Sequence, residues 1–435
     1  MSHFQSKRFQ DLSENYEEIN PIIELKKNRE NSKLKVLDLT ETNPTKLGFN
    51  YPKEMMLHEI ANEFSWIYEP NPQGLQSARE AIQNYYIERL STNVTNQFDV
   101  SELFHPDKFY LTSGTSEAYA LVLKSITNPS DEILVQSPGY PLLDFLARWE
   151  LVEPVSFESI ADIESKITKR TRAIMIVQPN NPNGYTLSLD EIQAYESIAY
   201  KYNLVVIIDE VFADYVNSNI LYHYFISNRV PVITVNGLSK LAGLPGWKLA
   251  WIHLQIPEDP ESLWNEIPKR LEWLTDSYLS VNSIVQEVLP TILSSRHMIQ
   301  NQIRSRIRRN YGKAMEILAD KEDINIPEYN GGWYINISIE LNREKLESLN
   351  QNLLSNGISK DDLDSIGHPD ELFAITLLQQ YGIYLHTGSM FNFSKEMNED
   401  SNDKIRIILI LSLIVKEEDF HEAILGLSSL CSSRV

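Results

Sequence analysis

The stretch SKLAGLPGWK, residues 239–248, sets a lysine and a hydroxyl just after the apolar run PVITV at residues 231–235. The apolar run predicts a short buried strand, and the small residues around Lys240 allow the backbone to pass close to a ligand. Burial lowers the pKa of a lysine amine from about 10.4 and makes the amine nucleophilic near neutral pH. Lys240 is therefore a candidate for imine formation, although a lysine taken alone is more often a solvated surface charge.

The bulk properties of the chain exclude several classes of protein. The 435 residues are 42% hydrophobic and 23% charged, which is ordinary for a globular protein of more than one domain. A formal net charge of -21 argues against a nucleic-acid partner. The single cysteine, Cys431, excludes an internal disulfide, and no segment resembles a signal peptide or a membrane span, so we expect a cytoplasmic protein with no membrane partner. The nine histidines show no metal-ligand spacing, and we expect no metal site.

From about residue 77 onward, apolar strands alternate with amphipathic helices. Strands are expected at residues 108–112, 132–135, 172–177, 204–208 and 230–235, with helices such as 77–90, 116–126 and 189–202 among them. Near-continuous apolar strands in βα units indicate an α/β fold, with a mostly parallel sheet sandwiched by helices and ligands at the carboxyl ends of the strands.

After about residue 285 the pattern changes to a long helical segment, roughly 284–319, and then to mixed pieces with strands at 331–337 and 405–414. This change predicts a second, smaller α+β domain. The expected division is an N-terminal arm that contributes to the small domain at 1–50, a large cofactor-binding domain at 51–290 and the small C-terminal domain at 291–435.

Three loops that follow predicted strands carry side chains suited to a planar, phosphorylated ligand. Residues Ser113-Gly114-Thr115 join a strand to a helix start, which suits phosphate, although an ordinary helix cap explains them at least as well in isolation. Tyr140 offers a ring at the same sheet edge, but a lone tyrosine is more often simple packing. Asn181 belongs to the turn-forming sequence NNPNG and could equally hold a ligand oxygen.

A fourth position, Asp209, comes directly after five apolar residues, so its carboxylate is expected to be partly buried and to need a cationic partner. A phosphorylated pyridine aldehyde accounts for all of these residues together. Its phosphate would meet Ser113-Gly114-Thr115, its ring Tyr140, its protonated ring nitrogen Asp209, its phenolic oxygen Asn181 and its aldehyde carbon Lys240. The carboxylate keeps the ring nitrogen protonated, and the ring then accepts electrons from a substrate carbanion.

With these residues the chain resembles fold-type I pyridoxal-phosphate enzymes of the class I/II aminotransferase family, over nearly its whole length. The matching pieces, in chain order, are Asn43-Pro44-Thr45, Tyr68 with Gly74 and Leu75, Ser113-Gly114-Thr115, Pro138-Gly139-Tyr140, Asn181-Pro182-Asn183-Gly184, Asp209-Glu210, Ser239-Lys240, Gly331-Gly332-Trp333 and Gly388-Ser389-Met390-Phe391. It is the order and spacing of these pieces that make the match specific.

The resemblance implies a pyridoxal 5'-phosphate-dependent aminotransferase that moves an amino group between an amino acid and a 2-oxo acid through a Schiff base on Lys240. Lys240 would also transfer the substrate's α-proton, Asp209 would pair with the pyridinium, and Asn181 would bond the phenolic oxygen. Such enzymes are usually homodimers. The residues that the resemblance assigns to the phosphate are Ser113, Gly114, Thr115, Ser239 and Lys248, with Tyr68 reaching it from the other subunit.

Two departures from the family pattern concern the cofactor. Lys248 stands where many relatives carry arginine, so phosphate binding keeps the charge but loses the bidentate fork. Phe212 stands where a tyrosine commonly donates to the cofactor's phenolic oxygen, and phenylalanine cannot donate. Because a hydrogen bond to a charged group contributes roughly 1.5 to 3 kcal/mol, we expect the imine of Lys240 to titrate about one or two pKa units higher. The alternative is that Phe212 only packs against its surroundings.

A third departure concerns the arginine that usually binds the substrate's α-carboxylate on a late strand of the small domain. Counting back from the final helix, at 417–430, places Ile410 at that position, and the candidate nearby is Arg406. Arg406 shares the strand parity of Ile410 but would lie about 13 Å away at the usual rise per residue. If Arg406 does not bind the carboxylate, Asn181 or the backbone near Asn43 is left to do so.

Other functions share parts of this pattern. A lyase, decarboxylase or cyclising synthase of the same fold is the main alternative, and the altered carboxylate site and Phe212 favour it. A cofactor-binding regulator fused to a DNA-binding domain is not expected, because the N-terminal arm is too short for that domain. A nicotinamide enzyme is disfavoured, because no Gly-x-Gly-x-x-Gly follows the first strand.

Overall fold

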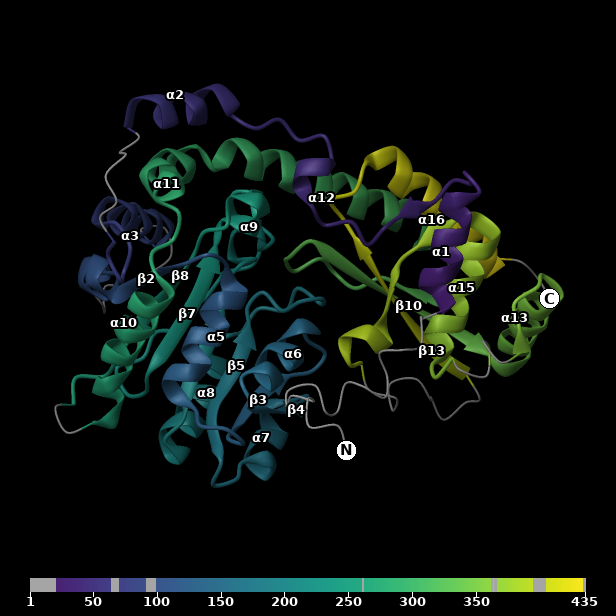
Figure 1. Ribbon diagram of the computed structural model, residues 1–435. Helices are drawn as coiled ribbons and strands as arrows, with labels where there is room; N and C mark the ends of the chain where they lie inside the picture. Colours follow the sequence, from purple (N-terminus) through teal and green to yellow (C-terminus); the bar gives the residue numbers. More distant parts are fainter. Residues whose placement is uncertain are drawn as a thin grey trace, which may run out of the picture.

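The computed structural model describes residues 21–63, 70–90, 99–259, 262–360, 363, 366–393 and 404–432. These residues form a large, mostly parallel sheet with helices on both faces and a smaller antiparallel sheet with its own helices (Figure 1). The predicted α/β fold with a smaller α+β part is confirmed. The exact domain boundaries stay a prediction.

The large sheet has seven strands in the order β2-β8-β7-β6-β5-β3-β4. Their bounds are β2 Phe109–Thr112, β3 Glu132–Gln136, β4 Glu153–Phe157, β5 Thr171–Val177, β6 Val205–Asp209, β7 Val232–Gly237 and β8 Ala250–Gln255. Strand β8 runs antiparallel to both of its neighbours, and the other pairs are parallel. The carboxyl ends of β2, β3, β5, β6 and β7 therefore lie at one edge of the sheet.

Helices cover both faces of this sheet because successive side chains of a strand point to opposite sides. The helices are α2 Lys53–Glu63, α3 Gln76–Leu90, α4 Val100–Leu103, α5 Thr115–Ile126, α6 Leu142–Trp149, α7 Ile160–Lys166, α8 Leu189–Tyr202, α9 Leu238–Leu241, α10 Glu266–Tyr278 and α11 Ser283–Ser295. Ile133 and Val135 pack with α5, α6 and α10, whereas Leu134 packs with α7 and α8. Helices α3 and α11 cover the edge near β2 and β8, and α2 lies over α11 (Figure 1).

The small sheet has the strand order β12-β13-β10-β9. Its strands are β9 Ile324–Asn325, β10 Tyr334–Asn342, β12 His386–Thr387 and β13 Lys404–Ser412; its helices are α1 Pro21–Asn31, α12 His297–Leu318, α13 Arg343–Ser355, α15 Pro369–Tyr381 and α16 Glu417–Ser432. A separate parallel pair joins β1 (Leu37–Asp38) to β11 (Ile383–Tyr384). One face of the sheet, which includes Ile337 and Leu409, packs on α12, α15 and α16. The opposite face carries Ile408 and Ile410, which pack against Phe391.

The long helical segment expected at 284–319 consists of two helices, α11 and α12, which meet at Arg296. The Arg296 side chain takes part in the break. Its Nη1 donates to the carbonyl oxygen of Leu293 at 2.6 Å, and its Nη2 lies 2.8 Å from Glu88. Helix α12 then runs from the large sheet to the small one (Figure 1).

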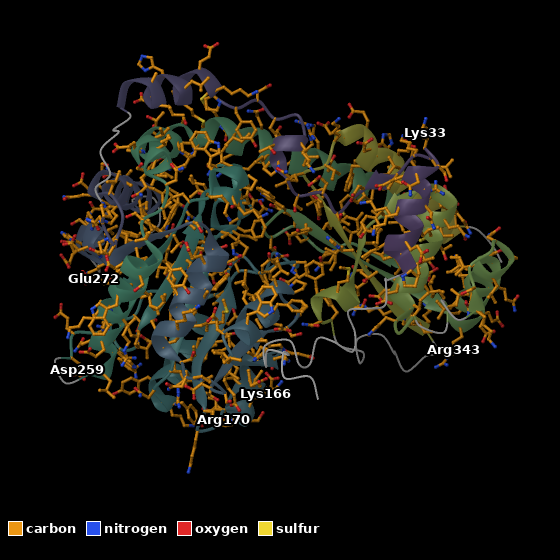
Figure 2. The ribbon with its side chains drawn as sticks, in the orientation of Figure 1. Lys33, Lys166, Arg170, Asp259, Glu272 and Arg343 are labelled. Carbon is orange, nitrogen blue, oxygen red and sulfur yellow. The ribbon has the colours of Figure 1, made fainter. Side chains whose placement is uncertain are left out.

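Charged side chains form ion pairs near the amino-terminal end of β5. Figure 2 shows Lys166 and Arg170 at the lower margin of the large sheet, next to the start of β5, where Nη2 of Arg170 pairs with Oε1 of Glu132. The carboxyl ends of the parallel strands lie at the other end of the sheet, toward α9. Within the described ranges, no helix combines the length and the apolar character that crossing a bilayer requires.

Candidate active site

Lys240 lies on the short helix α9, directly after β7 and at the carboxyl edge of the large sheet. Its Nζ is 4.8 Å from the centre of the Trp333 ring and 5.7 Å from that of Phe212. Burial lowers the pKa of Lys240 to about 8, and the nearby carboxylate of Asp209 opposes this shift. Tyr215 holds the helix in place by donating its hydroxyl to the Lys240 carbonyl oxygen at 3.0 Å. The predicted nucleophilic amine therefore has the surroundings that its chemistry requires.

Asp209 ends β6 and is only 4% exposed. Burial raises the pKa of its carboxyl to about 6, against the effects of two hydrogen bonds and of Lys240. One bond comes from the hydroxyl of Tyr119 on α5, and the other from the backbone N–H of Val211 at 2.9 Å. A buried carboxylate in this state is stabilised by a cationic partner, as the sequence predicted.

Tyr119 is a site residue that the sequence reading missed. It follows Thr115 by four positions on α5, and residues four apart lie on one face of a helix. That spacing was the available signal, because it puts Tyr119 on the same face of α5 as Thr115, one turn into the helix. The next carboxylate, Glu210, belongs to a different cluster and accepts from Tyr222 at 3.0 Å.

The loop Ser113-Gly114-Thr115, predicted to form a phosphate cradle, lies at the start of α5. A Cβ atom placed on Gly114 would lie 3.1 Å from Nζ of Lys248, so the predicted lysine reaches this cradle. The backbone N–H of Ser113 donates to Oε2 of Glu117 at 2.5 Å, a contact that the sequence reading missed. Glu117 stands at the third position of the helix, where acidic residues commonly cap free N–H groups.

Asn181, Tyr140 and Ser239 lie at the same edge. Asn181 is 8% exposed, and its Oδ1 is buried with no hydrogen-bond partner among the described residues. Tyr140 is half-buried. Burial and the nearby negative charge of Asp209 raise the pKa of the Tyr140 hydroxyl to about 12. Ser239 precedes Lys240 on α9 and is also half-buried.

An aromatic wall closes the site on the side of the small sheet. Phe212, which is 2% exposed, meets the rings of Trp333 and Tyr334 edge-on at 5.6 and 6.5 Å between ring centres. Tyr334 in turn meets Phe391 at 6.3 Å. Phe212 thus packs against other rings and also faces Lys240, so the structure is compatible with both interpretations of this residue.

Besides Asn181, the predicted substrate-binding residues are Asn43 and Arg406, which lie at the start of the turn η2 (Pro44–Lys46) and on the small sheet. Asn43 caps this turn, where its Oδ1 accepts from the backbone N–H of Thr45 at 3.1 Å. Arg406 lies on β13, with its Nη2 3.5 Å from Oγ of Ser338 on the neighbouring strand. Tyr68 lies outside the described residues.

The residues at this edge fit a phosphorylated pyridine aldehyde. Asp209 is a buried carboxylate whose pKa is raised, and a protonated ring nitrogen would stabilise its charge. A side chain at position 114 would crowd Nζ of Lys248, because an added Cβ atom would lie only 3.1 Å from it, so glycine leaves the loop accessible to that amine. The unpaired amide oxygen of Asn181 adds a polar group with no partner in the described part of the chain.

Comparison with known proteins agrees with this geometry. A family model described as aminotransferase class I and II matches residues 45–409. The glutamate-pyruvate aminotransferase AlaA of Escherichia coli K12 is 27% identical over 391 residues, which cover 86% of this chain and 87% of that protein. An alanine aminotransferase of Mycobacterium tuberculosis H37Rv is 28% identical over 316 residues, or 69% of each protein.

Solved structures share the fold. An alanine aminotransferase from Pyrococcus furiosus superimposes with a TM-score of 0.77 at 23% identity and covers 99% of this chain and 100% of its own. A tyrosine aminotransferase from Leishmania infantum gives the same TM-score at 19% identity, over 99% of this chain and 98% of its own.

Proposed function

Because the chain belongs to the class I and II aminotransferases, we propose that it holds pyridoxal 5'-phosphate on Lys240 and transfers an amino group between an amino acid and a 2-oxo acid. The observation that carries this proposal is the placement of Lys240 beside Asp209. Burial favours the neutral amine of Lys240, and a cationic ring nitrogen would compensate the buried charge of Asp209.

When bound, pyridoxal 5'-phosphate supplies an aldehyde carbon and an electron-accepting ring. In our proposal Asp209 holds the ring nitrogen, Tyr140 stacks on the ring, and Asn181 donates to the phenolic oxygen beside Phe212. The residues proposed to hold the phosphate are Ser113, Gly114, Thr115, Ser239 and Lys248, together with Tyr68 of a second subunit.

Lys240 has two tasks in this proposal. Its Nζ would hold the cofactor, and its free amine would move the proton of the substrate's α-carbon. The rings of Trp333 and Phe212, 4.8 and 5.7 Å from Nζ, keep bulk water away from the amine. The low pKa of Lys240 suits this task because a base works best when its pKa is near the working pH.

Substrate binding is proposed to use Asn181, the segment around Asn43 and Arg406. Ser412 donates to the backbone oxygen of Glu41 at 2.8 Å, which fixes that segment against β13. The relatives named above act on glutamate and pyruvate or on alanine, so L-alanine, L-glutamate and their 2-oxo acids form the first panel to assay.

We also propose that the protein is a cytoplasmic homodimer. Trp273 on α10 and Leu279 just after it are 70% and 65% exposed, and large exposed apolar side chains are candidates for a protein interface. Sedimentation of the protein and of a Trp273→Glu variant tests the assembly. A wild-type monomer at micromolar concentration would contradict it.

The decisive experiment reduces the cofactor-loaded protein with borohydride and maps the modified peptide by mass. We expect a pyridoxyl group on Lys240, and its absence from a Lys240→Arg variant with the same thermal stability. Addition of L-alanine or L-glutamate to the unreduced protein should convert the cofactor to its amine form in a single turnover. A reduced protein without modification at Lys240 would overturn the proposal.

A further inference from the structure

Three strands of the small sheet bring Asn336, Ile410 and His386 into one row. Asn336 on β10 pairs directly with Ile410 on β13, which pairs directly with His386 on β12. Residues directly opposite each other in antiparallel strands share one face of the sheet, with Cβ atoms about 5 Å apart. The three side chains are therefore neighbours, although they come from segments far apart in the sequence.

This face of the small sheet looks toward Lys240. Tyr334 lies two residues before Asn336 on the same face, and its ring is 6.5 Å from that of Phe212, which borders Lys240. At the other end of the row, His386 lies 5.7 Å from the Phe391 ring. Phe391 contacts Tyr334, so the aromatic wall of the site and the row form one continuous surface.

The row carries unused hydrogen-bonding atoms. Asn336 Oδ1 and His386 Nδ1 are buried, and neither has a hydrogen-bond partner in the described part of the chain. Between them, Ile410 is fully buried and packs against Phe391. Since buried polar atoms are nearly always paired, two such atoms on the wall of a site indicate contact with a ligand.

The charges around the row do not favour a carboxylate. The pKa of His386 is lowered by burial to about 4, so the ring is neutral at pH 7. The hydrogen-bonded turn that follows His386 is held by two acids, because Ser389 donates to Asp370 at 2.8 Å and to Glu371 at 3.2 Å. A carboxylate at the row would lose its hydration, and neither the neutral ring of His386 nor the amide of Asn336 would supply a compensating positive charge.

Two cations lie in the wider surroundings, and both have other contacts. Lys26, which influences His386 electrostatically, is paired with Asp38 at 2.6 Å. Arg406 is four residues before Ile410 on β13, about 13 Å away along the strand, and lies beside Ser338.

We propose that Asn336 and His386 form a neutral hydrogen-bonding subsite. It selects, for one of the two half-reactions, an amino compound whose amine-bearing carbon carries a hydroxymethyl or carboxamide group in place of a carboxylate. The inference rests on the proposed function, because Lys240 must mark the position of that carbon. The other half-reaction keeps an amino acid and its 2-oxo acid as the amino-group source or sink.

Equilibrium binding of stable adducts tests the subsite without turnover. The probes are phosphopyridoxyl-L-alanine and phosphopyridoxyl-L-alaninol, which differ only in a carboxylate and a hydroxymethyl group, each titrated into the cofactor-free protein by calorimetry. We expect the alaninol adduct to bind at least as tightly as the alanine adduct. Asn336→Leu should weaken the alaninol adduct roughly threefold to tenfold and leave the alanine adduct within about twofold.

Two further variants keep the test sharp. Asn325→Leu makes the same change on the exposed neighbouring strand β9 and should alter neither affinity. Asn336→Arg should reverse the preference toward the alanine adduct, because it adds the missing cation. If the alanine adduct binds the wild-type protein tenfold or more tightly than the alaninol adduct, the subsite inference is wrong and the proposed function stands. If pyridoxamine 5'-phosphate and both adducts fail to bind, the proposed function falls with it.

Discussion

The hydroxyl of Tyr119 on α5 donates to Oδ2 of Asp209 at the end of β6. This bond links the helix that begins at the predicted phosphate cradle to the carboxylate predicted to face the cofactor's ring nitrogen. Burial raises the pKa of the Asp209 carboxyl. The hydrogen bond from Tyr119 opposes this shift and favours the ionised carboxylate.

Tyr119→Phe should therefore raise the pKa of Asp209 above about 6, by roughly one further unit. A buried acid with a raised pKa is ionised only at higher pH, so cofactor affinity in the variant should weaken at pH 6 to 7 and recover near pH 8.5. Fluorescence titration with pyridoxal 5'-phosphate across this pH range measures the shift. Tyr110→Phe is the matched control, because Tyr110 is buried in the same core and donates to a backbone oxygen. Equal pH profiles for wild type and Tyr119→Phe would contradict the prediction.

The pKa of Lys240 sets the pH dependence of cofactor attachment. Only the neutral amine attacks an aldehyde, and with a pKa of about 8 its fraction rises with pH and levels off above that value. The second-order rate of adduct formation with pyridoxal 5'-phosphate should thus increase about tenfold per pH unit below 8 and then reach a plateau. Stopped-flow absorbance follows the reaction, with Lys240→Arg as the blank. A rate that keeps rising through pH 10 would indicate an ordinary, solvated lysine.

Phe212→Tyr tests the departure from the family pattern. The ring borders Lys240 at 5.7 Å, so an added hydroxyl can donate to an anionic oxygen of the cofactor. We expect the pKa of the Lys240 nitrogen in the loaded protein to fall by about one or two units, as a bond of roughly 1.5 to 3 kcal/mol implies. Spectrophotometric titration measures it, and Phe391→Tyr, on the far side of Tyr334, serves as the control. If the two variants titrate alike, Phe212 has a packing role only.

The large sheet and most of the site were predictable from the sequence because they depend on local patterns. Strands β5 and β6 are near-continuous apolar runs, as expected for strands buried on both faces, and each ends at a polar loop. In a parallel sheet those loops lie at one edge. The order of strands and helices along the chain therefore predicted that Asp209 and Lys240 lie close together.

The remainder depends on register and on side-chain reach, which single-sequence patterns do not encode. The row of Asn336, Ile410 and His386 exists only because three antiparallel strands pair in one particular register. The break at Arg296 depends on a guanidinium that bonds both Leu293 and Glu88, two partners far apart in the sequence. The sequence pattern of residues 284–319 is helical throughout and does not indicate the break.

Glu117 places a negative charge where the cofactor's phosphate is proposed to bind. Its carboxylate accepts from the backbone N–H of Ser113 at 2.5 Å, so phosphate and Glu117 compete for one donor and repel each other. Glu117→Gln should bind pyridoxal 5'-phosphate several-fold more tightly and show a smaller loss of affinity at low salt. The same change should cost about 0.5 to 1 kcal/mol of stability, because an acidic residue in the first turn of α5 favours the helix.

Calorimetric binding at two ionic strengths and urea unfolding of the cofactor-free protein measure the two effects separately. Glu102→Gln is the matched control, since Glu102 lies in the first turn of another helix, α4, and is exposed. If Glu117→Gln weakens cofactor binding, then Glu117 orders the cradle more than it competes with the phosphate. In that case the Ser113 N–H, together with Lys248, needs the acid to hold its position.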